Sequence, residues 1–124
     1  MKKQGNLKII NNSTGTLIGD KIKYAGTFFL RLKGLLGCTF LEPGAGLLLY
    51  PCSSVHSFGM KISIDVLFLD ENLRVLRTVP WMKPGLTARQ KGARFVLELK
   101  AGTIERLGIK TGDILNISYS ENSR

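Results

Sequence analysis

The stretch from Cys52 to Met60 holds side chains that are well suited to chemistry: a thiol, the only imidazole of the chain and a thioether. In an extended segment the side chains alternate between two faces, so Cys52, Ser54, His56, Phe58 and Met60 fall on the same side. The spacing therefore predicts one wall of a pocket that carries sulfur and imidazole groups.

Nucleophilic catalysis is one use of these groups. His56 would activate the Cys52 thiol and Asp65 would orient the imidazole, as in Cys–His hydrolases. Residues four apart on one strand lie about 13 Å apart, which is too far for a direct hydrogen bond. The dyad therefore needs a bend of the chain near Ser53 or Ser54.

A metal site and simple packing are the other two alternatives. Soft sulfur ligands with imidazole suit copper(I) or zinc, and Cys38 or Asp65 could complete a set that begins with Cys52 and His56. Two cysteines and one histidine are too few for a closed four-ligand zinc site without a carboxylate. In the packing alternative Cys52 and Met60 fill the core, and His56 bonds a backbone carbonyl or Asp65.

Asp65 stands inside an apolar strand, where a carboxylate must be hydrogen-bonded, paired with a cation or exposed in a cavity. A clamp that accepts amide hydrogens from a neighbouring loop meets this need, and so does contact with a ligand. Glu98 raises the same question less sharply, because alternation along its strand predicts an outward side chain.

Residues 80–92 are predicted as a loop, and the segment 81–94 combines an aromatic side chain with positive charge. Trp81 is followed by Lys83, Arg89, Lys91 and Arg94, with no acidic residue among them. Proteins that bind single-stranded nucleic acid use such groups to stack bases and to contact phosphates. No recognised nucleic-acid motif is present, so a merely solvated basic loop is the alternative.

The elements that must position these groups are short. Extended segments are predicted at 7–10, 16–24, 46–50, 62–70, 73–79, 93–99 and 114–119, and short helices near 27–36 and 102–107, with Thr103 as a possible N-cap. Apolar residues on both faces of 62–70 predict a central strand. Without long helices alternating with the strands, we expect a mainly β (α+β) fold, a small closed or partly open β-barrel of about seven strands.

Composition limits the class of protein. The 124 residues include 18 Lys and Arg against 9 Asp and Glu, a net charge of +9, and fit one domain over 1–124. Two cysteines are too few for a disulfide scaffold, and no apolar run suffices for a signal core or a membrane span, so we expect a cytoplasmic protein. Neither GxGxxG nor GxxxxGKS/T occurs, which disfavours nucleotide-dependent catalysis, and no cofactor is expected.

Six motifs follow one another along the chain: Gly34-Leu35-Leu36-Gly37, Pro43-Gly44-Ala45-Gly46-Leu47-Leu48, Cys52-Ser53-Ser54-Val55-His56-Ser57-Phe58-Gly59-Met60, Ile64-Asp65-Val66-Leu67-Phe68-Leu69-Asp70, Val96-Leu97-Glu98-Leu99-Lys100-Ala101-Gly102 and Gly112-Asp113. From about residue 25 to 119 the series resembles a bacterial and archaeal family known as domain of unknown function number 192. Many members carry tryptophan in place of Gly59, and asparagine and threonine in place of Ile62 and Ser63, so this chain resembles the branch with cysteine and histidine. The resemblance implies a small barrel-like β domain without an established activity.

We therefore expect a small non-catalytic binding or accessory module for an unknown small ligand or protein partner. The ligand-binding candidates are Cys52, His56, Met60, Asp65 and Trp81. One alternative is a thiol- or metal-dependent enzyme that uses Cys52, His56 and Asp65. A second is binding of nucleic acid or another polyanion through the basic segment 81–94.

Overall fold

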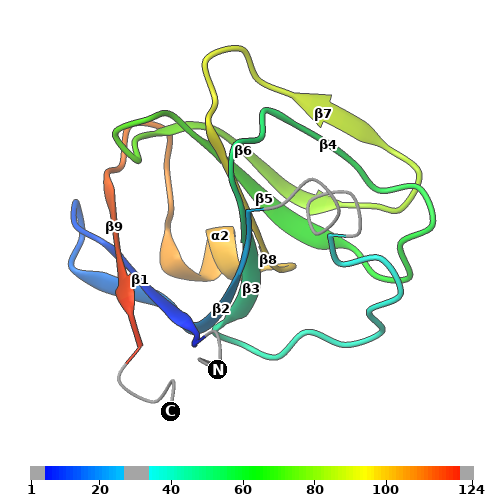
Figure 1. The fold of residues 1–124 in the computed structure, drawn as a ribbon, viewed down its shortest axis with the longest axis horizontal. Coiled ribbons are helices and arrows are strands. Elements are labelled where there is room, and N and C mark those ends of the chain that lie inside the picture. Colours follow the sequence, from blue (N-terminus) through cyan, green and yellow to red (C-terminus); the bar gives the residue numbers. More distant parts are fainter. Residues whose placement is uncertain (1–4, 27–33, 121–124) are drawn as a thin grey trace.

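The computed structural model describes residues 5–26 and 34–120 and shows a mainly β fold, as predicted (Figure 1). These residues form nine strands and one short helix: β1 Leu7–Asn11, β2 Thr16–Ala25, β3 Ala45–Leu49, β4 Ser54–His56, β5 Ile64–Leu69, β6 Val75–Met82, β7 Thr87–Arg89, β8 Phe95–Lys100, α2 Thr103–Leu107 and β9 Leu115–Tyr119. Most of the helix predicted over 27–36 lies outside the described residues, and residues 34–37 form a turn.

Seven of the strands form one curled sheet, in the order β6-β5-β8-β3-β2-β1-β9 (Figure 1). The strands β1 and β2 pair antiparallel, as do β5 and β6, while β2 and β3 pair in parallel. The two edge strands approach each other at one end, where Arg74 bridges Ile114 and the Val75 amide donates to the Asp113 carbonyl at 2.8 Å. The sheet is therefore barrel-like.

The strands β4 and β7 form a separate two-stranded ribbon, with Val55 opposite Ala88. The prediction of a continuous loop over 80–92 was therefore wrong, because β6 extends to Met82 and β7 occupies 87–89. Pro80 fits into β6 because this strand is at the edge of the sheet. Proline has no amide hydrogen, and at an edge no neighbouring strand loses a hydrogen bond as a result.

Two apolar clusters lie on opposite faces of the curled sheet. The inner cluster includes Leu67 of β5 and Leu97 of β8, together with Ile104 of α2. The outer cluster includes Val66 of β5 and Val96 of β8, which pack with residues of the β4–β7 ribbon. All six residues of β5 are buried, so the predicted central strand is confirmed and has cover on both faces.

The helix α2 begins after Gly102 and ends at Gly108, both in the left-handed region with φ of 94° and 64°. Thr103 is not the N-cap, because its hydroxyl donates to the Lys100 carbonyl instead. The side chain of Asp65 accepts a hydrogen bond from the Ile104 amide in the first turn. Among residues 5–26 and 34–120, no helix combines the length and the apolar character required to cross a membrane.

Candidate functional site

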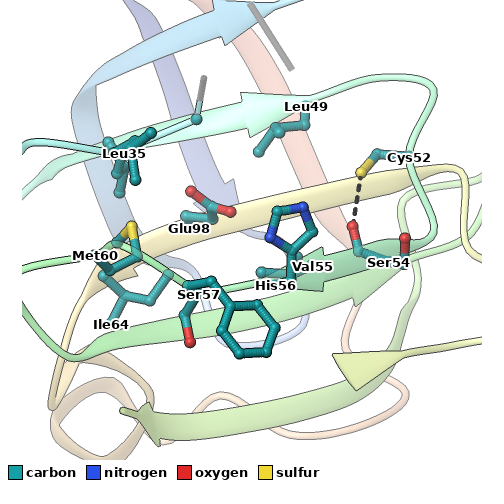
Figure 2. Close-up of a pocket in the computed structure, with 13 residues that line it drawn as sticks. Leu35, Leu49, Cys52, Ser54, Val55, His56, Ser57, Met60, Ile64 and Glu98 are labelled. Atoms are coloured by element: carbon teal, nitrogen blue, oxygen red, sulfur yellow. Dashed lines mark hydrogen bonds between the residues drawn. The ribbon is translucent and has the colours of Figure 1, made fainter. Parts of the chain in front are cut away.

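A pocket of about 90 Å³ lies on the outer face of the sheet (Figure 2). Residues of the central strands line it, Leu49 from β3, Ile64 from β5 and Glu98 from β8. Side chains of β4 and of the segments around it complete the lining: Gly34, Leu35, Leu36, Cys52, Ser54, Val55, His56, Ser57, Phe58 and Met60. We call this the Glu98 pocket.

Glu98 is the acidic group of this pocket. Val96 and Glu98 share the outer face of β8, and Glu98 stands between Leu47 of β3 and Val66 of β5 in the sheet. The expected outward direction is thus correct for the sheet, but the covering segments leave Glu98 only 5% exposed. Among the described residues its Oε1 atom has no hydrogen-bond partner. Burial raises the pKa of Glu98 from 4.5 to about 7, because an apolar environment disfavours the charged form.

His56 is the last residue of β4, where it pairs with Thr87 of β7. It is exposed, and its ring lies 6.1 Å from the ring of Phe58, measured between centroids. His56 and Glu98 line the same pocket from different elements (Figure 2). The pocket therefore combines an imidazole at its rim with a carboxyl group at its base.

Cys52 and Met60 also line the Glu98 pocket, so the structure brings three of the predicted residues together. The Cys52 amide donates to the Arg94 carbonyl at 2.9 Å, and its thiol donates to the Ser54 carbonyl at 3.2 Å. The bond to Ser54 holds the thiol against the backbone two residues further along the chain (Figure 2).

The strict alternation that the sequence predicted from Cys52 to Met60 does not hold. The extended stretch lasts only from Ser54 to His56, and Val55 rather than its neighbours is buried in the outer cluster. A turn follows, in which the Met60 amide donates to the Ser57 carbonyl and Gly59 has a φ of 81°. Residues of both parities therefore reach the pocket.

Ser57 fixes this turn to the segment that follows β6. Its hydroxyl donates to the Lys83 carbonyl at 2.6 Å and accepts from the Leu86 amide at 2.9 Å. The Ser57 amide also donates to the Leu86 carbonyl at 2.8 Å. The wall of the pocket is thus tied to the connection between β6 and β7.

Asp65 and Trp81 lie apart from the Glu98 pocket. Asp65 is fully buried on the inner face of β5, where its carboxylate accepts from the Trp81 amide at 2.8 Å and from the Ile104 amide at 2.7 Å. This is the clamp that the sequence offered as one alternative. Trp81 is not in a loop but near the end of β6, where its side chain is exposed.

The remaining metal and polyanion candidates are separated in space. The Cys38 thiol donates to the Phe40 carbonyl at 3.1 Å, and in the described part of the chain no three His, Cys, Asp or Glu side chains are grouped so that they could hold a metal ion. Two cations of the basic segment lie at opposite ends of β5. Lys83 directly follows Met82, which pairs with Ile64 at the start of β5, whereas the Arg94 amide donates to the Leu69 carbonyl at its end. The four cations therefore do not gather at one place.

Sequence reasoning left Glu98, Ser57 and Leu35 out of the candidate site. An acidic residue between Leu97 and Leu99 in an otherwise apolar strand was the available signal for Glu98. It became informative only when the cover of the outer face was known. Ser57 gave no signal, because its partners lie 26 and 29 residues further along the chain.

The fold and this site define a small, mainly β domain that carries a pocket between its curled sheet and an outer two-stranded ribbon. The chain matches the model of the family DUF192, described as "Uncharacterized ACR", over residues 9–117, and it belongs to that family of unknown function. It is 31% identical over 123 residues to a UPF0127 protein of Thermococcus sibiricus, covering 91% of this chain and 76% of the relative.

Further comparisons agree on family and fold. A UPF0127 protein of Pyrococcus horikoshii is 33% identical over 112 residues, which cover 85% of this chain and 94% of the relative. A crystal structure of a protein of unknown function from Novosphingobium aromaticivorans superposes with a TM-score of 0.78 at 24% identity, covering 90% of this chain and 83% of that one. At this identity the structural similarity concerns the fold alone.

Proposed function

We propose that this protein is a binding module whose Glu98 pocket takes a small ligand with a short apolar part and a positively charged nitrogen. The observation that carries the proposal is the buried carboxyl group of Glu98, whose Oε1 atom has no partner among the described residues. A buried polar group without a partner costs about 1–3 kcal/mol, and a charged one costs more. A ligand that donates to Glu98 removes this cost.

The lining supports the chemical class of the ligand. Leu35, Leu49, Val55 and Ile64 contribute apolar side chains, while Glu98 supplies the acidic group. A short alkylammonium ion matches this arrangement, because its chain contacts the apolar wall and its charge pairs with the carboxylate. Binding requires only the Glu98 carboxyl group and no reaction at the Cys52 thiol.

Ligand binding should depend on pH in a defined direction. The pKa of Glu98 is about 7, so about a tenth of the free protein carries the charged carboxylate at pH 6 and about nine tenths at pH 8. An ammonium ion binds the charged form. Its affinity should therefore rise about tenfold from pH 6 to pH 8.

Propylammonium and its neutral analogue 1-propanol test this proposal by methyl-detected NMR. Propylammonium should shift the methyl signals of Leu49, Val55 and Ile64 at pH 8, more weakly at pH 6, and far less in Glu98→Gln. The control variant Glu105→Gln, which changes an exposed glutamate of α2, should respond as the wild type does. Equal shifts by propylammonium in wild type and Glu98→Gln, or equal responses to the two probes, would contradict the proposal.

A further inference from the structure

A second hollow, of about 310 Å³, lies at the end of the sheet that carries Trp81 and is separate from the Glu98 pocket. Its lining includes Phe40, Ile62, Trp81 and Lys100. Phe40 is 72% exposed and Trp81 is 56% exposed. Two large aromatic side chains are thus turned to solvent beside one hollow, and the core does not use them.

The backbone at Trp81 is held in an unfavourable conformation that places this ring. The pairing of β5 with β6 is irregular between Ile64 and Val66, so the segment that contains Trp81 bulges opposite Asp65. Trp81 has a φ of 52°, which residues other than glycine rarely adopt. The buried Asp65 carboxylate accepts the Trp81 amide and stabilises this bulge. Such conformations persist where the surroundings enforce them, and they are concentrated at functional sites.

The ring of Trp81 also lies close to the turn that begins α2. A Cβ atom added at Gly102 would stand 3.5 Å from Cζ2 of the indole. Asp65 accepts a hydrogen bond from the amide of Ile104 in α2 as well as from the amide of Trp81. One buried side chain thus fixes the backbone of Trp81 and the first turn of α2. The backbone that carries Trp81 is therefore held before any ligand arrives.

The charge around the hollow is positive. The Nζ atom of Lys100 lies 5.9 Å from the centroid of the Phe40 ring, and Lys61 adjoins the lining residue Ile62 in the sequence. The nearby carboxylate of Glu42 is paired with Lys21 at 3.0 Å. With a net charge of +9 for the chain, a flat ligand with negative charge is favoured over a neutral one.

We infer that this surface, made of Phe40, Trp81 and Lys100, binds single-stranded nucleic acid by stacking bases on the two aromatic rings and pairing phosphates with the lysine. Single strands expose the faces of their bases, whereas a duplex hides them. The inference rests on different residues from the Glu98 pocket, so either can fail without the other.

Trp81 is the single tryptophan of the chain, so tryptophan fluorescence reports on this surface directly. Titration with a 12-residue oligothymidylate at low salt should quench the fluorescence of Trp81, and added salt should release the strand. Anisotropy of the same strand with a fluorescent label should show affinity about tenfold or more weaker in Trp81→Gly and in Phe40→Ala. Glycine adopts the positive φ without strain, and Phe40 is largely exposed, so both variants should fold.

Matched controls separate this surface from general positive charge. Lys100→Gln should weaken binding, whereas Lys91→Gln, with the same change of charge beyond the opposite end of β8, should not. Phe58→Ala, which removes another exposed aromatic side chain in the Glu98 pocket, should leave affinity unchanged. Equal losses in the two lysine variants, unchanged affinity in Trp81→Gly and Phe40→Ala, or binding of thymidine monophosphate as tight as that of the strand would overturn the inference.

Discussion

Replacing Glu98 by glutamine should stabilise the protein at alkaline pH and leave its stability nearly unchanged at acid pH. Burial raises the pKa of Glu98 from 4.5 to about 7, so the folded protein holds this proton more tightly than the unfolded chain does. Between these two values the folded state binds more protons, and the free energy of unfolding therefore falls as the pH rises. The stabilising contribution is complete below pH 4.5 and is lost by the time the pH passes 7.

The size of the effect follows from the pKa. A tenfold change in acidity corresponds to about 1.4 kcal/mol, so the rise from 4.5 to about 7 represents about 3 kcal/mol. Glutamine has nearly the same shape and cannot ionise. The variant should therefore exceed the wild type by less than about 1 kcal/mol near pH 5 and by about 3 kcal/mol near pH 8.

Urea unfolding of both proteins from pH 5 to pH 8.5 measures this difference directly. All other titrating groups are common to the two proteins, so their contributions cancel when one curve is subtracted from the other. Glu105→Gln, at an exposed position of α2, serves as the control and should give a flat difference. Parallel curves for wild type and Glu98→Gln would show that Glu98 ionises freely in the folded state, and the argument for its burial would fail.

Two further substitutions test the hydrogen bonds that shape the two sites. Asp65→Asn should lower the free energy of unfolding by about 2–3 kcal/mol, because each carboxylate oxygen serves a different backbone amide and an asparagine NH2 cannot accept. Urea unfolding measures this loss, and Asp70→Asn is the control, because the one oxygen that asparagine retains accepts from both the Asn72 and the Arg74 amides. Little change is expected in this control, and equal losses in the two variants would refute the assignment. Ser57→Ala should cost about 1–2 kcal/mol and accelerate hydrogen exchange at the Leu86 amide, whereas Ser53→Ala, on an exposed residue, should do neither. Unchanged exchange at Leu86 would show that the hydroxyl does not hold the pocket wall.

The pattern of apolar residues predicted much of the sheet. Strands with alternating or continuous apolar residues, such as 62–70, were found close to their expected limits. A strand buried on one or both faces requires a recognisable local pattern of apolar residues. The ribbon of β4 and β7 was not predicted. Each strand has three residues, and their pairing joins positions more than thirty residues apart, which no local pattern records.

The site was predicted in part for a similar reason. The cluster of unusual side chains from Cys52 to Met60 indicated a pocket, and the structure brings Cys52, His56 and Met60 into one. The path of the chain between them was not predictable, because the turn at 57–60 depends on the distant partners of Ser57. Asp65 was included because its chemistry is unusual in a strand, but the face of β5 that it occupies is the inner one.

Asp65 and Glu98 differ in whether the fold itself supplies partners for a buried acid. They lie in neighbouring strands, both are buried and both interrupt apolar runs, yet the sequence pointed to Asp65 and predicted an outward side chain for Glu98. Asp65 receives two backbone amides from the chain itself, whereas Oε1 of Glu98 receives no partner among the described residues. Neutral isosteres should therefore act in opposite directions at pH 8, with Asp65→Asn lowering stability and Glu98→Gln raising it. Opposite signs would show that the fold depends on the Asp65 carboxylate and is weakened by the charged form of Glu98.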